Sequence, residues 1–376
     1  MIRKFQGSAF MLFLMLYIIG LNFIVIPLIA DIMTHIGHRE PFLQLLFSPW
    51  GIIIFPQMLG LLLPLVIWLT IKREDIHIYM RISNFGITNV ILIVFISIFL
   101  QPLMMLIAGI SSLFTPNLIG NAVGGMVQQY PWWLLMLAIA VTPSIIEELL
   151  FRGYIQTAYK DRPFRKAAII NGLFFGIMHL NIHQFTYAFV MGIIFAYMVH
   201  YTRSVLAGML SHFIMNGIQV TLIYLTMQMQ IPESAYLFEA FETTVYSNGS
   251  NFPMFEISDE ILGVVLIGVI ALISTPCAFV LFRAFKTYNR QRNIKHDLQQ
   301  ALNTSNIIDI SSEIFKNNSL AEFLSTQPEE FSTIRDKDKE NENKDESELG
   351  RLKSLLNKID PFLIASVVLF LLLWLL

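Results

Sequence analysis

The sequence predicts an all-α fold, a polytopic membrane helical bundle of about eight spans with a short C-terminal apolar segment as a candidate ninth. Of the 376 residues, 55% are hydrophobic and only 14% are charged, a balance that water-soluble domains of this size do not tolerate. Apolar runs of roughly 17 to 25 residues, which as helices cross about 30 Å of hydrocarbon, recur along the chain. Backbone groups in lipid must be paired within their own segment, so we expect these runs to be helices. The runs lie at residues 8–32, 51–71, 87–110, 131–152, 166–181, 184–201, 204–228 and 261–282, followed by 361–376.

The first run is expected to be a retained span, because it is longer than the apolar part of a signal peptide and lacks a small-residue cleavage site. The connections that follow alternate in charge. Every second connection is basic, whereas those between them are nearly free of Lys and Arg. By the positive-inside rule, the N-terminus is cytoplasmic and eight spans return the chain to the cytoplasm. The basic connections carry Arg3, Lys4, Lys72, Arg73, Arg81, Lys160, Arg162, Arg165, Lys166, Arg203, Arg283, Lys286, Arg290 and Arg292.

Composition divides the chain into six parts. The segment 287–360 is polar and contains a mixed-charge run, so we expect a disordered cytoplasmic linker that could tether a cytoplasmic partner. The final apolar segment is either a short tail anchor or an interfacial segment. In order, the parts are N-terminal transmembrane helices (1–115), a core that carries the candidate chemistry (130–225), an acidic outer loop (229–260), a transmembrane helix (261–286), the linker (287–360) and the C-terminal apolar anchor (361–376).

Charge and cysteine usage exclude some classes of partner and site. The net charge of −2 and the lack of a basic face with interleaved aromatics argue against a nucleic-acid partner. Cys277 is the only cysteine, so the chain has neither an intramolecular disulfide nor a cysteine-based zinc cluster. The partners that remain are the lipid bilayer and a membrane-associated protein or peptide.

Acidic residues appear abruptly in the fourth run. No Asp, Glu, Lys, Arg or His occurs between Ile82 and Ile146, and then Glu147, Glu148 and Arg152 follow. Ionisable residues within a membrane segment are costly and are functional candidates by default. Glu148 and Arg152 are four residues apart, so on a helix they share a face and should pair. Glu147 is rotated by about 100° from Glu148 and stays available for proton transfer.

Histidines stand out in the spans that follow. His179 ends a run in which Gly172 and Gly176 form a small-residue face that allows close helix approach. Arg162 lies in the expected turn of a helical hairpin, with Glu147 15 residues before it and His179 17 residues after it. Glu147 and His179 should therefore lie at nearly the same height and could meet.

His212 and Asn216 lie four residues apart on one face of the seventh span. Both side chains can donate hydrogen bonds to a developing oxyanion, although each is also a common interhelical hydrogen-bonding residue. We expect His183 to be a loop residue at the outer turn and His200 to lie at the interface beside Tyr201.

These motifs, in this order on successive spans, resemble those of the CPBP intramembrane proteases, also called the Abi or CAAX-protease family, which include the Ras-converting CAAX endopeptidases. The motifs are Glu147-Glu148-x-x-x-Arg152, Phe175-x-x-x-His179 and His212-x-x-x-Asn216. The resemblance covers about 130–225 and makes this segment a CPBP/Abi-like protease core. It implies that Glu147 and His179 activate water, that His212 and Asn216 stabilise the oxyanion, and that Glu148 and Arg152 support the site.

The sequence therefore predicts an intramembrane endopeptidase of a bacterial cell membrane that hydrolyses a membrane-associated protein or lipidated peptide. One alternative is a non-proteolytic scaffold or bacteriocin-immunity-type protein, in which the polar residues only lock helices together. A transporter is a weaker alternative, because no paired Gly/Pro-broken spans are visible. The motifs by themselves specify no cofactor. A zinc site of His179, His183 or His212 with Glu147 stays open, although the chain lacks the His-Glu-x-x-His signature.

Overall fold

The computed structural model describes residues 6–46, 48, 50–73, 79, 81–228, 259–303 and 361–375. In these residues the only regular secondary structure is helical, without a β-strand, which confirms the all-α prediction. The chain forms two compact units, residues 1–281 with 362–376 and residues 282–361. The residues with candidate chemistry lie wholly in the first unit.

Within the part of the chain that the structure describes, six helices are long and apolar enough to cross a bilayer, at 6–35, 87–112, 132–158, 182–202, 205–228 and 261–297. The run predicted at 51–71 corresponds to a shorter apolar helix, Pro56–Lys72. The run predicted at 166–181 corresponds to α11 (Phe164–Ile177), which has only 14 residues. The total of eight or nine spans therefore stays a prediction, whereas membrane-spanning helices as such are supported.

The N-terminal helices form a group of their own. α1 (Gln6–Gly20), η2 (Leu21–Val25) and α2 (Ile26–His35) make one continuous helix, and α3 (Arg39–Leu46) folds back against α2. Gly37 allows this turn, since its φ of 75° is unfavourable for residues with a side chain. The chain continues through η3 (Trp50–Ile54), η4 (Pro56–Leu62) and α4 (Leu63–Lys72), and η4 packs on the segment that carries Glu147.

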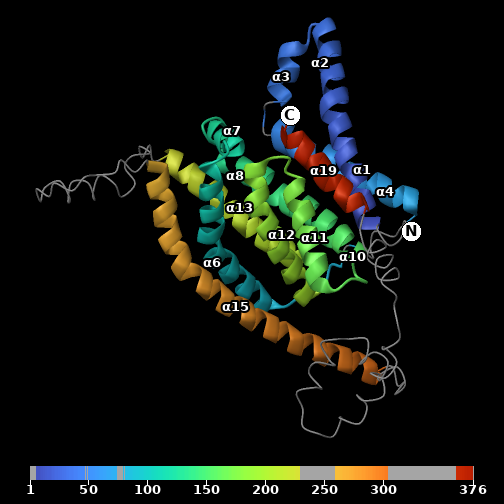
Figure 1. The fold of residues 1–376 in the computed structure, drawn as a ribbon, viewed down its shortest axis with the longest axis vertical. Helices are drawn as coiled ribbons and strands as arrows, with labels where there is room; N and C mark the ends of the chain where they lie inside the picture. The colour runs from blue at the N-terminus through green and yellow to red at the C-terminus, as the bar shows by residue number, and fades with distance from the viewer. Residues whose placement is uncertain are drawn as a thin grey trace, which may run out of the picture. The chain divides into compact units, whose positions relative to one another are not determined.

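The core of the unit consists of long helices that pack around the acidic segment (Figure 1). The first member of this core is a helix over residues 132–158, in which α-helical and π-helical turns alternate without a break. The other members are α6 (Ile87–Ser112), α7 (Leu118–Val127), α11, α12 (Ile182–Thr202) and α13 (Val205–Gln228). The 132–158 helix comprises α8 (Trp132–Leu135), η5 (Met136–Val141), α9 (Thr142–Glu148), η6 (Leu149–Ile155) and α10 (Gln156–Ala158).

Small residues bring α11 and α12 into backbone contact, as the sequence predicted for Gly172 and Gly176. A Cβ on Gly172 would lie 2.8 Å from the carbonyl oxygen of Phe189, and one on Gly192 would lie 2.7 Å from Gly172 Cα. Such distances leave no room for a methyl group. This close packing helps to position the site, because the carbonyl oxygen of Gly192 accepts a hydrogen bond from Arg152.

Replacement of Gly192 by Ala is therefore expected to lower the free energy of unfolding by about 1–3 kcal/mol, the usual cost of overpacking. The added methyl meets backbone atoms, which cannot move as a flexible side chain can. Denaturant titration in detergent would measure the change. Gly263→Ala is the control, because nothing lies within 4 Å of its Cβ position, and it should be neutral or slightly stabilising. Equal stabilities of the two variants would contradict the prediction.

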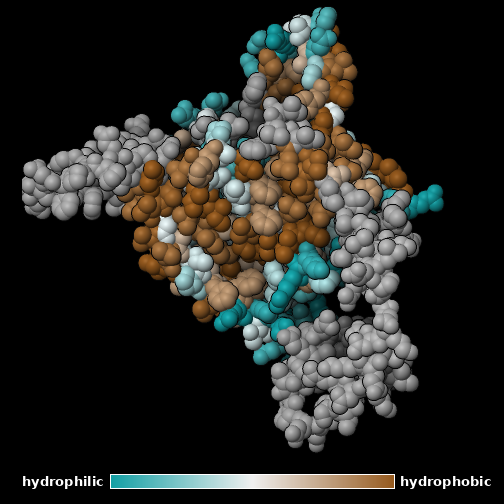
Figure 2. All heavy atoms as spheres, in the orientation of Figure 1, coloured by the Kyte–Doolittle hydropathy of each residue, from teal (hydrophilic) through white to brown (hydrophobic). Residues whose placement is uncertain are grey.

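Hydrophobic side chains also cover exposed faces of the helices. Figure 2 shows them over much of the visible face, and Ile71, Leu272 and Ile273 are each at least 70% exposed. Large exposed apolar surfaces of this kind are unfavourable in water and mark contact with lipid or a partner. The finding agrees with an integral membrane protein.

The structure tests only some of the predictions made for the C-terminal part of the chain. Residues 229–258 of the predicted outer loop 229–260 and residues 304–360 of the predicted linker 287–360 lie outside the described residues. The helix predicted at 261–286 is longer than expected, since α15 runs from Asp259 to Asn303. The residues after 286 include many good helix formers and no Gly or Pro before 303, which explains the extension. α19 (Pro361–Leu375) is helical, and Phe370 stacks on Phe185 of α12 with ring centroids 5.4 Å apart.

Candidate active site

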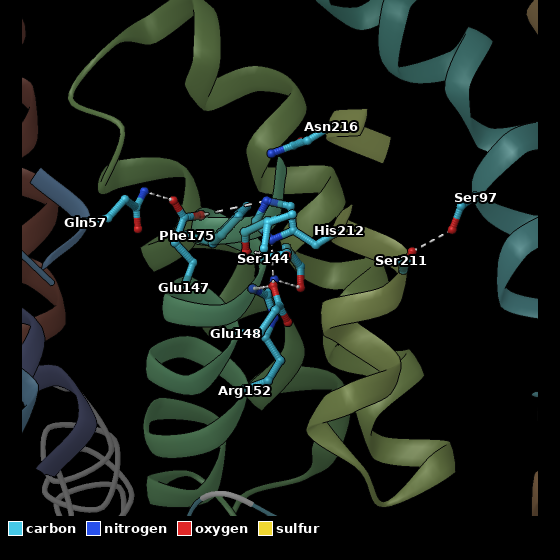
Figure 3. Close-up of polar contacts among 12 residues, drawn as sticks. Gln57, Ser97, Ser144, Glu147, Glu148, Arg152, Phe175, Ser211, His212 and Asn216 are labelled. Carbon is cyan, nitrogen blue, oxygen red and sulfur yellow. Dashed lines mark hydrogen bonds and ion pairs between the residues drawn. The ribbon is translucent and has the colours of Figure 1, made fainter. Parts of the chain in front are cut away.

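The acidic segment places neighbouring carboxylates on different sides of one helix. Glu147 and Glu148 end α9 and are 8% and 0% exposed. In Figure 3, Glu147 points toward Gln57, while Glu148 points toward Arg152. This is the divergence expected from a rotation of about 100° per residue. The two carboxylates therefore have separate partners.

Glu148 and Arg152 form a fully buried ion pair, as their spacing predicted. Arg152 Nη1 donates to Glu148 Oε1 at 2.6 Å, and Nη2 donates to the carbonyl oxygen of Gly192 at 2.9 Å. The guanidinium also lies over the rings of Phe175 and Phe195, 4.5 and 5.2 Å from their centroids. Hydrogen bonds and aromatic faces thus replace the water that a buried cation loses.

His212 joins this pair to Glu147. Its Nδ1 lies 3.1 Å from Glu148 Oε1, and its Nε2 lies 4.0 Å from Glu147 Oε2. Because a carboxylate only accepts, Nδ1 carries the proton and donates to Glu148. The ring stacks on Phe195, with centroids 5.2 Å apart, which fixes its orientation. The Nε2 edge is consequently held facing Glu147.

Glu147 receives a hydrogen bond from a residue outside the predicted core. Gln57 Nε2, on η4, donates to Glu147 Oε1 at 2.6 Å. Sequence reasoning missed Gln57, because a single uncharged Gln in an N-terminal apolar run carries no motif. The one available signal was that Gln57 is a polar residue within the run 51–71, which is otherwise almost wholly apolar.

His179 lies in the turn after α11, not within a span. Its Nδ1 lies 2.8 Å from the carbonyl oxygen of Phe175 and must be the donor, which leaves the Nε2 lone pair available when the ring is neutral. The next residue, Leu180, has a φ of 48°, a left-handed conformation that non-glycine residues seldom adopt. No ion pair joins His179 to Glu147 among the described contacts, so the direct meeting of the two is not seen.

The two residues instead share a cavity of about 530 Å³. Glu147, His179, Gln57 and Gln184 supply polar groups to its wall, and most of the remaining lining is apolar. Most of the apolar part comes from the N-terminal helices, which contribute Ile18, Leu21, Val25, Phe42, Phe55 and Leu61 among others. A cavity with apolar walls and a few convergent polar groups is the usual form of a binding site.

Asn216 is held one helical turn beyond His212. Its Nδ2 donates to the carbonyl oxygen of Ile139 at 3.1 Å. Pro143 has no N–H to give that carbonyl in an α-helical ladder, so the proline makes an acceptor available to the side chain. The second amide hydrogen of Asn216 is not used by this bond. α13 is further tied to α6 by Ser211 and Ser97, whose hydroxyl oxygens are 2.8 Å apart.

Zinc does not fit the donor set of the described residues. These residues contain no group of three or more His, Cys, Asp or Glu close enough to hold a metal ion.

His183 is buried in the first turn of α12, so its predicted place in an outer loop is wrong. The side chain of Asn181 caps this turn by accepting from the N–H of Gln184. The ring of His200 stacks on Phe164, with centroids 3.6 Å apart.

Comparison with known proteins identifies a family over the same residues. Residues 129–218 match the model of the Rce1-like family, described as type II CAAX prenyl endopeptidase Rce1-like. The matched range includes every predicted site residue, whereas Gln57 and the N-terminal cavity wall precede it. No curated protein and no solved structure matches the chain. The resemblance seen in the motifs is thereby confirmed, and the chain is a helical membrane protein whose residues 129–218 match the Rce1-like family model.

Proposed function

We propose that this protein is an intramembrane endopeptidase that hydrolyses a peptide bond of a membrane-associated protein or lipidated peptide, with Glu147 as general base. One observation carries the proposal. The carboxylate of Glu147 lies in the wall of a largely apolar cavity that it shares with His179, and its Oε2 faces His212 Nε2 at 4.0 Å. A buried base beside a largely apolar binding cavity suits hydrolysis within a membrane.

In the proposed reaction, a water molecule held by Glu147 and His179 attacks the peptide carbonyl carbon. Glu147 takes the proton of the water as the C–O bond forms, and the proton passes to the departing amine as the C–N bond breaks. His212 and Asn216 donate hydrogen bonds to the oxyanion, the former from a ring that carries protons on both nitrogens. Glu148 and Arg152 hold His212 in orientation. No step requires a metal.

The substrate class is proposed from the cavity and the helices around it. Apolar side chains dominate the lining, so an acyl or prenyl chain or an apolar peptide segment would be bound there. The alternation of the loop charges supports a cytoplasmic N-terminus. The proposed location is a bacterial cell membrane, with the cavity reached from the cytoplasmic half. The bilayer itself is then a partner, and the segment 287–360 would tether a cytoplasmic protein.

The purified protein in lipid nanodiscs is expected to cleave a peptide with a lipidated cysteine near its C-terminus. The same peptide without the lipid should be cleaved at least tenfold more slowly, because the apolar cavity then has less surface to bury. Mass spectrometry of the products would locate the cleaved bond. Turnover that persists after exhaustive chelation supports the glutamate mechanism, whereas a loss that zinc restores would overturn it.

A scaffold without peptidase activity is the second candidate. Arg152, Glu148 and His212 each hydrogen-bond to a neighbouring helix or to one another across helices, as a locking role requires. A scaffold would cleave neither the lipidated peptide nor the peptide without the lipid. The scaffold reading also predicts that changes at Glu147 leave the biological activity intact.

A further inference from the structure

Gln57 contacts the proposed base from a segment outside the Rce1-like match. It lies on η4, 90 residues before Glu147, and η4 packs directly against α9. We propose that Gln57 is a positioning residue for the peptidase centre, which holds one oxygen of Glu147 so that the other faces the attacking water. The inference deepens the proposed function and rests on it.

The direction of the hydrogen bond supports this role. An ionised carboxylate only accepts, so the amide nitrogen of Gln57 must be the donor to Glu147 Oε1 at 2.6 Å. The terminal torsion of a Glu side chain has a broad distribution and does not fix the carboxylate plane. With Oε1 held by Gln57, Oε2 is directed to the side where His212 Nε2 lies 4.0 Å away.

The other end of the amide argues against a purely structural role. Gln57 Oε1 is buried and has no hydrogen-bond partner within the described part of the chain. A buried amide oxygen without a partner costs free energy, so a residue that only joined helices would be better replaced by an apolar one. Gln57 also lines the cavity, where the bond to Glu147 is its single polar contact among the described residues.

Local sequence explains how Gln57 reaches the site. Pro56 precedes it at the start of η4, and the turn is π-helical. Proline cannot donate in the backbone ladder, and π-helical turns change the direction of the side chains that follow and are frequent at functional sites. The sequence of the N-terminal helices thus contributes to the active site as well as to the cavity wall.

Gln57→Met tests the proposal, because Met has a similar length and no donor. We expect kcat on the lipidated peptide to fall about ten- to a hundredfold with KM little changed, since a hydrogen bond to a charged group is lost. Leu59→Ala is the control on the same segment. Leu59 lines the same cavity, so its truncation should raise KM with kcat unchanged. An unchanged kcat in Gln57→Met, or a pattern like that of Leu59→Ala, would overturn the proposal.

A second variant at the same position keeps the proposal testable if Gln57→Met does not fold. Gln57→Glu keeps the size of the side chain and replaces the amide donor by a second carboxyl group beside Glu147. The two carboxyl groups then share a proton, which makes Glu147 a poorer acceptor for the proton of water. We expect Gln57→Glu to lower kcat at least as much as Gln57→Met. Full activity of a folded Gln57→Glu protein would count against the positioning role.

Infrared spectroscopy separates this inference from the proposed function. The carboxylate stretching band of Glu147 can be assigned as the band that Glu147→Gln removes, and it should shift in Gln57→Met without any substrate. An unshifted band in an active peptidase overturns the role of Gln57 alone. A shifted band in a protein that cleaves no peptide overturns the proposed function and the positioning role with it.

Discussion

Glu147→Gln is expected to reduce peptide cleavage by a factor of about 10² to 10⁴, the usual contribution of a general base. The substitution replaces a proton acceptor by an amide of the same shape. The oxygen of the new amide can still accept from Gln57 Nε2, which donates to Glu147 at 2.6 Å in the native protein. Folding should therefore be preserved while proton transfer is lost. Single-turnover cleavage assays in nanodiscs would measure the fall.

Glu40→Gln is the matched control for this change. Glu40 is an exposed residue in the first turn of α3, so the same chemical substitution should leave turnover unchanged. Thermal unfolding of both variants should agree with the wild type within a few degrees. A Glu147→Gln protein that cleaves at the native rate would remove Glu147 from the mechanism and favour the scaffold reading.

Arg152→Met is expected to lower the free energy of unfolding by about 3–5 kcal/mol, the cost of removing one partner from a buried ion pair. Both side chains of the pair with Glu148 are 0% exposed. Without Arg152, the charge of Glu148 would be buried with His212 as its main partner, 3.1 Å away. The carbonyl of Gly192 would also lose its donor. Equilibrium unfolding in detergent measures the effect.

The double variant Glu148→Gln/Arg152→Met shows whether the unpaired charge of Glu148 causes the loss of stability in Arg152→Met. Removal of both charges takes away the uncompensated carboxylate, so the double variant should be more stable than Arg152→Met alone. Arg39→Met, at an exposed position on α3, is the control and should change stability by less than about 0.5 kcal/mol. If Arg152→Met is no more destabilising than Arg39→Met, the buried pair does not stabilise the fold.

Local periodicity correctly predicted two contacts around the candidate site. The pairing of Glu148 with Arg152 follows from four-residue spacing on one helix face, and the structure shows it. The close approach of α11 and α12 follows from Gly172 and Gly176, whose lack of a side chain admits a neighbouring backbone. Both predictions depend on residues close together in sequence, where helix geometry fixes relative direction.

Predictions across turns were less accurate. The hairpin count placed Glu147 and His179 at the same height, and they do share one cavity, but they form no ion pair among the described contacts. α11 ends at Ile177, so His179 belongs to a turn whose direction a residue count cannot give. His183 was misplaced for the same reason, because the start of α12 depends on the cap at Asn181.

The sequence by itself determined an all-helical membrane protein, the Glu148–Arg152 pair and the motif order that resembles the CAAX proteases. These properties follow from composition and from side-chain spacing within single helices. Only the tertiary structure decided that His212 joins the two carboxylates, that Gln57 donates to Glu147, and that the N-terminal helices wall the cavity. Such contacts join segments far apart in the chain, and their geometry is set by how π-helical turns and glycine contacts rotate and space whole helices.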